Sequence, residues 1–139
     1  MTTFDPQFFK KFEFGQKQIS GYLRNAARDL EIAEKDSFVE VRFSYCYQAM
    51  LKSGIALIAK QGYKTRSVVG HHIKILEKMA EILKNPEIAI YGNAMRAKRN
   101  LDLYEGGVVL GESEVSSFVS FVKDTLNSIR SLIERDRDK

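Results

Sequence analysis

Apolar residues recur at steps of three and four through most of this chain, which is the spacing that one face of an α-helix requires. With its glycine and proline interruptions, the pattern predicts helices over residues 14–35, 37–61, 71–83 and 112–137, and another that carries Ile88 and ends near Gly106-Gly107. No alternation of apolar and polar residues is long enough to predict a strand. We therefore expect an all-α fold, an antiparallel bundle of four main helices plus short extra helices, as a single domain over residues 1–139.

The predicted helix over residues 37–61 is apolar around most of its circumference. Such a helix lies at the centre of a bundle or is buried in an oligomer interface. Ser37-Phe38-Val39-Glu40 matches a capping box at its start, and Gly62 is placed to end it. Near the N-terminus, Asp5-Pro6 is suited to start a short aromatic turn that holds Phe8, Phe9 and Phe12.

Composition places the chain among ordinary globular proteins, with 44% apolar and 29% charged residues. The single cysteine, Cys46, lies in an apolar run and is expected to be a buried thiol in a reducing compartment. One cysteine and the pair His71-His72 do not make a Cys/His metal site, and we expect no metal or cofactor. The start of the chain lacks the features of a secretory signal, and no apolar run approaches the ~20 residues that span a bilayer. We expect a cytoplasmic protein without a membrane segment.

The net charge of +4 is concentrated in the middle of the chain. Residues 60–91 carry six lysines and arginines against three acidic residues, and residues 63–70 are expected to form a basic loop. Such a region is compatible with nucleic acid or nucleotide phosphates, although its charge is far less dense than that of a dedicated DNA-binding arm.

The most informative stretch is Arg96-Ala97-Lys98-Arg99-Asn100-Leu101-Asp102-Leu103-Tyr104. Helical spacing lines up Arg96, Arg99, Asn100 and Tyr104 on one face, where a buried helix would carry apolar residues. Guanidinium groups bind two phosphate oxygens at once, an amide can orient a sugar or base edge, and a tyrosine can stack on a base. In the alternative interpretation this face is solvated, and Arg99 pairs with Asp102 or Glu105.

The pair His71-His72 opens the third predicted helix. Adjacent helical residues point about 100° apart, so at most one of the two is expected to face the arginine stretch. A histidine there could act as a general acid or base because its ordinary pKa is near neutrality. The alternative is an exposed or core histidine without a chemical role.

Three segments together give the chain a family resemblance. They are Tyr45–Lys52 in the second helix, the Gly62–Ser67 loop that leads to Gly70-His71-His72, and Arg99-Asn100 on the penultimate helix. Within residues 37–105 the chain resembles the HEPN superfamily, small helical proteins of prokaryotic toxin–antitoxin and defence systems. Many members are metal-independent ribonucleases that dimerise so that two motifs face each other across a cleft.

The resemblance implies a motif in which an arginine and a polar residue are followed by a histidine after four to six intervening residues. Arg99-Asn100 match its start, but Tyr104 stands at the histidine position, and the wider window reaches only Glu105 and Gly106. Tyrosine, with an ordinary pKa of about 10, is a poor proton acceptor at neutral pH. If this protein cleaves RNA, His71 or His72 must therefore move the proton.

Three functions remain in view. The first is a dimeric HEPN-like protein that binds RNA or a nucleotide without catalysis, with Arg96, Arg99, Asn100 and Tyr104 lining the cleft. The second is a metal-independent endoribonuclease that uses this face and a histidine. The third is an interaction partner of a minimal nucleotidyltransferase, which in some systems modifies a tyrosine; the usual target position is Gly106 here, and Tyr104 would be a displaced acceptor. The binding protein ranks first because the motif is half present.

Overall fold

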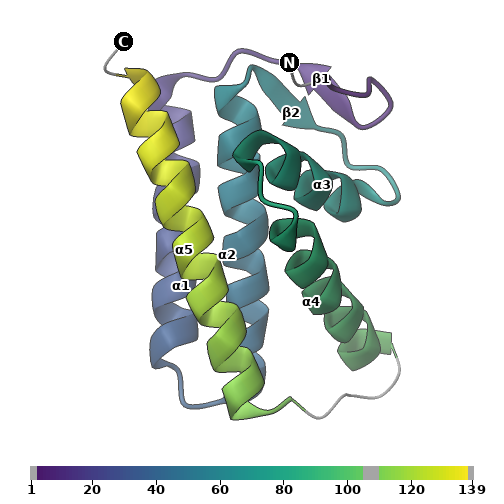
Figure 1. Ribbon diagram of the computed structural model, residues 1–139, viewed down its shortest axis with the longest axis vertical. Coiled ribbons are helices and arrows are strands. Elements are labelled where there is room, and N and C mark those ends of the chain that lie inside the picture. Colours follow the sequence, from purple (N-terminus) through teal and green to yellow (C-terminus); the bar gives the residue numbers. More distant parts are fainter. Residues whose placement is uncertain (1–2, 105–109, 138–139) are drawn as a thin grey trace.

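The computed structural model describes residues 3–104 and 110–137, which form five helices and two short strands. The elements are β1 (Phe9–Lys11), α1 (Gln16–Lys35), α2 (Val39–Lys60), β2 (Tyr63–Thr65), α3 (His71–Leu83), α4 (Glu87–Tyr104) and α5 (Glu112–Arg137). The predicted all-α helical bundle is confirmed (Figure 1). Within the described ranges, no helix combines the length and hydropathy needed to cross a membrane.

Three long helices, α1, α2 and α5, lie side by side, and α4 leans away from them beside α2 (Figure 1). The shorter α3 lies crosswise and packs against both α2 and α4. Helices α1 and α2 are antiparallel because only residues 36–38 connect them. Both α3 and α4 lie on the side of α2 away from α1, with an open angle between them (Figure 1).

The centre of the core is α2, as its apolar circumference predicted. Its most deeply buried large side chains are Tyr47, Met50, Leu57 and Ile58. Cys46 is also buried, and this burial raises the pKa of its thiol to about 12. A thiol with so high a pKa stays protonated at neutral pH and is unreactive, which agrees with the structural role expected of it.

Two glycines allow α3 to pack closely against its neighbours. A Cβ atom at Gly54 on α2 would lie 2.8 Å from Ile75 Cγ2, and one at Gly92 on α4 would lie 2.6 Å from Leu76 Cδ2. Both separations are shorter than carbon atoms tolerate, so any larger residue would push α3 outward. The position of α3 between α2 and α4 therefore depends on these glycines.

The start of α2 differs from the predicted capping box. The helix is preceded by Phe38 as its N-cap, and no side chain caps its first N–H groups. The helix thus begins one residue later than the Ser37 box requires, and the side chain of Asp36 accepts a hydrogen bond from the Phe38 N–H at 2.8 Å. Gly62 does follow the end of α2 as predicted, and its φ of 88° is one that glycine adopts without strain.

The two strands were not predicted. Phe8 and Phe9 donate backbone hydrogen bonds to Asp5 O, so a turn does begin at Asp5, but the chain then extends into β1. β1 pairs with β2 antiparallel, with Phe9 opposite Thr65 and Lys11 opposite Tyr63. Burial of the Phe9 side chain, which is 3% exposed, and pairing to a distant segment outweigh the local preference for a turn.

Candidate functional site

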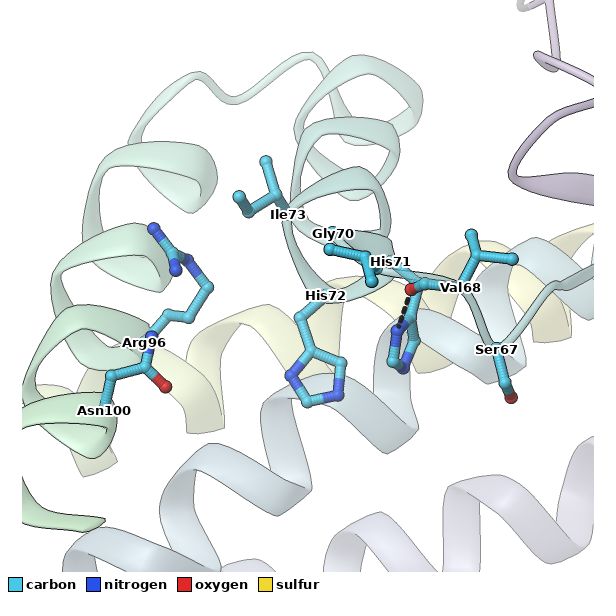
Figure 2. Close-up of a pocket in the computed structure, with 9 residues that line it drawn as sticks. Ser67, Val68, Gly70, His71, His72, Ile73, Arg96 and Asn100 are labelled. Carbon is cyan, nitrogen blue, oxygen red and sulfur yellow. Dashed lines mark hydrogen bonds between the residues drawn. The ribbon is translucent and has the colours of Figure 1, made fainter. Parts of the chain in front are cut away.

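A groove of about 540 Å³ opens between the start of α3 and the middle of α4 (Figure 2). It brings together four of the predicted site residues, His71, His72, Arg96 and Asn100, from two helices. The remaining lining residues come from the segment before α3 and its first turn: Ser67, Val68, Val69, Gly70 and Ile73. One wall is thus cationic and polar, and the other is largely apolar.

Neither arginine of the predicted face forms an ion pair with a side chain in the described part of the chain. Arg96 Nε lies 3.5 Å from Asn93 Oδ1, and the Arg99 guanidinium lies over the Tyr47 ring, 5.6 Å from its centroid. Lys98 points elsewhere and pairs with Glu114 on α5 at 3.1 Å. The Arg96 guanidinium is therefore available to a ligand in this groove, whereas Arg99, which lies over Tyr47, is not among the residues that line it.

Tyr47 joins the site to the core. It comes from the middle of α2, its side chain is 1% exposed, and its hydroxyl lies 3.2 Å from His72 Nδ1. Burial raises the pKa of Tyr47 to about 12, although Arg99 and Arg96 oppose this rise. The hydroxyl therefore stays protonated at neutral pH and can donate to His72, which fixes the orientation of the imidazole.

The sequence prediction placed Tyr47 only in the core and missed its second role. A signal did exist, because a buried tyrosine hydroxyl needs a hydrogen-bond partner. The identity of that partner depends on where the crosswise α3 packs, and helical periodicity does not report this.

The two histidines differ in their surroundings. His71 turns back to the preceding segment, where its Nδ1 donates to the carbonyl oxygen of Val68 at 2.7 Å (Figure 2). His72 lies across the groove from Arg96, and its pKa is lowered by burial first and then by the charges of His71, Arg99 and Arg96. His72 is therefore neutral at neutral pH, and with its Nδ1 accepting from Tyr47 it carries its proton on Nε2.

The first turn of α3 adds backbone donors to the groove. Its N-cap is Gly70, whose φ of 84° favours glycine, and no side chain caps the helix. The N–H groups of His72 and Ile73 belong to this first turn, which carries no intrahelical acceptor for them. Together with the positive end of the helix dipole, such donors favour an anion.

Part of the predicted face cannot be placed. Tyr104 is the last residue of α4, but its side chain lies outside the described residues, as do the Asp102 side chain, Glu105 and Gly106. The alternative in which Arg99 pairs with Asp102 or Glu105 also falls there, as does the displaced-acceptor role of Tyr104.

The groove thus presents one guanidinium group, an amide, two imidazoles and uncapped N–H groups to one space, with the charge of Arg99 nearby. This combination suits an anion with several oxygen atoms, and its imidazoles suit proton transfer. Comparison of the chain with protein-family models, with curated proteins and with solved structures finds no match.

Proposed function

We propose that the groove between α3 and α4 binds a phosphate-bearing ligand, RNA or a nucleotide, and that the protein is a HEPN-like dimer. One observation carries the proposal: Arg96 lines the groove with His72 and the uncapped start of α3, Arg99 lies over Tyr47 where its charge acts on His72, and neither arginine has an ion-pair partner among the described side chains. Half-buried cations without a counter-charge favour an anionic ligand.

The groove also has a place for a base. Val68 and Ile73 line the wall opposite the cations, and the fully exposed side chain of Val69 stands at its edge. A nucleotide would place its phosphate at Arg96 and the start of α3, with its base against this apolar wall. The amide of Asn100 can then hydrogen-bond the sugar or a base edge.

An exposed apolar stripe on α4 supports the dimer. Its members follow one another at steps of four, three and four residues, the spacing of a helix-pairing seam: Ile90, Ala94, Ala97 and Leu101. Two-fold antiparallel pairing would set Ile90 against Leu101 of the partner subunit, with alanines at the crossing. Arg96 and Asn100 lie on the adjacent stripe, so this pairing would bring two grooves side by side.

The dimer is tested by Ile90→Glu, measured by sedimentation velocity. The side chain of Ile90 is 67% exposed, so a charge there is tolerated in a monomer but not in a helix pair. Phe38→Glu is the matched control because its side chain is also 67% exposed and lies off α4. A wild-type dimer that Ile90→Glu dissociates and Phe38→Glu preserves is expected. A monomeric wild type, or an Ile90→Glu dimer, contradicts this part of the proposal.

Ribonuclease activity is the second candidate function, and the geometry of the histidines favours it. His72 is neutral, and because its Nδ1 accepts from Tyr47 its own proton is on Nε2, while the Val68 carbonyl holds a proton on His71 Nδ1 and leaves Nε2 to accept one. His71 Nε2 can take the proton of a ribose 2′-hydroxyl as its oxygen bonds to the adjacent phosphorus, while the bond to the 5′-oxygen breaks and that oxygen takes a proton from solvent. Cleavage of RNA that His71→Gln abolishes, with RNA binding retained, is expected; RNA left intact by the wild type contradicts it.

The binding proposal is tested with Arg96→Gln/Arg99→Gln, using a fluorescent RNA of about twelve nucleotides at matched salt. Removal of two phosphate contacts should reduce the dependence of log affinity on log salt by about 1.4, at about 0.7 per contact for a single strand. Lys98→Gln is the control on the same helix, because Lys98 pairs with Glu114. Equal RNA affinity and equal salt slope in the double variant and the wild type would contradict the proposal.

A further inference from the structure

The two-stranded sheet of β1 and β2 has an outer face of cations and rings. Lys10 stands directly opposite Lys64, the Phe12 N–H bonds to Gly62 O at 3.0 Å, and the Arg66 N–H bonds to Phe8 O at 2.7 Å. Because side chains alternate along a strand, these pairs share the face opposite to that of buried Phe9. We call the set Lys10, Phe12, Lys64 and Arg66 the strand-pair platform; Phe8, at its edge, packs partly against the core.

The charges of the platform are not balanced. Lys10, Lys64 and Arg66 are exposed, and none forms an ion pair with a side chain in residues 3–104 or 110–137. Like charges directly opposite each other on paired strands are destabilising. Glu13 lies just after β1 but does not pair with them. The arrangement is unfavourable for the isolated protein and complementary to a polyanion.

The aromatic rings lie between these cations. The Phe12 side chain is 39% exposed, and Lys64 Nζ lies 4.7 Å from its ring centroid. Phe8 is half-buried, with Lys74 Nζ 5.1 Å from its ring centroid. Exposed rings beside backbone-neutralising cations are the arrangement on which unpaired bases stack, and they give a surface for a single strand rather than a duplex.

The platform is continuous in the chain with the groove. Residues 66–70 lead from β2 to the first turn of α3, where Gly70 and His71 line the groove (Figure 1). Five residues span at most about 18 Å, so the two surfaces lie within a few nucleotides of each other. Ser67 and Val68 line the groove from this same connection.

We infer that the strand-pair platform is a second contact surface for single-stranded nucleic acid, along which a strand bound in the groove continues, with bases on Phe12 and phosphates at Lys10, Lys64 and Arg66. The inference rests on the proposed function of the groove and specifies its ligand as a strand rather than a mononucleotide. The platform contacts phosphates and the faces of bases, which RNA and DNA share, so it binds single strands of either.

The test compares a dinucleotide with an RNA of about twelve nucleotides, in the range of single-strand site sizes. In Lys10→Gln/Lys64→Gln the salt slope for the long RNA should fall by about 1.4, while dinucleotide binding is unchanged. Phe12→Leu keeps an apolar side chain but removes the ring, and should weaken long-RNA binding about tenfold. Arg24→Gln/Arg28→Gln on α1 removes the same charge from exposed positions and should leave the slope unchanged.

The outcomes separate the platform from the groove. Long-RNA binding that is unchanged in both platform variants overturns the inference, and the groove proposal then stands or falls on Arg96→Gln/Arg99→Gln. A smaller salt slope in the platform variants supports the inference, provided that the slope falls equally for a DNA strand and that a duplex binds more weakly than the strand. Tighter binding of the duplex than of the strand, or platform-dependent binding to anionic lipid vesicles without binding to the long RNA, overturns it.

Discussion

Helices α2 and α4 have similar lengths but differ in how much of their surface is buried. Most side chains of α2 are buried, whereas on α4 the buried positions among the described side chains are Ile88, Gly92 and Met95. The rest of α4 carries Arg96 and Asn100 of the groove, Arg99 beside Tyr47, and the exposed seam that includes Ile90. We infer that α2 supplies the stability of the fold and that α4 uses its surface for binding.

The two helices meet functionally at Tyr47. Its ring belongs to the core, its hydroxyl reaches His72 on α3, and Arg99 of α4 lies over its face. Tyr47 is therefore one link between the groove and the core, in addition to the packing of α3 and α4 against α2. Substitutions in α2 should therefore change mainly the stability of the fold, and substitutions on the exposed surface of α4 should change mainly ligand binding.

The largest effect on stability is expected in α2. Leu57 is fully buried, so Leu57→Ala should reduce the free energy of unfolding by about 2–5 kcal/mol, from lost burial and the cavity left behind. Ile90→Ala on the exposed face of α4 should change it by less than about 0.5 kcal/mol. Urea denaturation of both variants, at a concentration where the wild type is monomeric, measures the difference. Equal losses would contradict the division between the helices.

The next effect concerns the contact between α3 and α4. Gly92→Ala forces the Leu76 side chain away and should cost about 1–3 kcal/mol by overpacking, while weakening RNA binding because the groove walls separate. Gly21→Ala on α1 is the matched control: the nearest atom to its Cβ is the flexible end of Arg24 at 3.8 Å. It should raise stability by up to about 1 kcal/mol. A Gly92→Ala protein that is as stable as the wild type would show that α3 is not tightly seated.

The smallest effect is the pH dependence carried by His72. Its pKa in the folded protein is below its ordinary value of 6.5, so below pH 6.5 the unfolded chain takes up a proton first. The free energy of unfolding should therefore fall as pH drops from 6.5 through the lower folded pKa, with no contribution above 6.5. His72→Gln should remove this part of the pH dependence, whatever constant offset it adds. Parallel pH profiles for the variant and the wild type between about pH 7.5 and 5.5 would contradict the lowered pKa.

Much of the fold could be predicted because helices leave a local pattern in the sequence, apolar residues at steps of three and four. The limits of α3 and α5 agree with the predicted 71–83 and 112–137; Gly70 and Pro86 flank α3, and Gly111 precedes α5. The strands could not be predicted in this way, because each has three residues and pairs with a segment more than fifty positions away. The capping box at Ser37 was wrong because Asp36 competes for the same stretch of backbone.

The candidate site could be predicted only in part. Helical spacing identified Arg96 and Asn100 as neighbours on one face, and both do line the groove. That His72 lies across the groove from Arg96, and that Tyr47 orients His72, depends on the crosswise packing of α3, which no local pattern encodes. A nucleotidyltransferase partner remains a prediction of the family resemblance.

The most direct test of the central claim uses the two imidazoles, since His71 and His72 are the only histidines in the chain. Their NMR signals can be assigned with His71→Gln and His72→Gln and followed while an RNA of about twelve nucleotides is added. We predict saturable shifts of both signals and a rise in the His72 pKa, because a phosphate beside the ring favours its charged form. Signals and a pKa that remain unchanged at saturating RNA would contradict the assignment of this groove as the binding site.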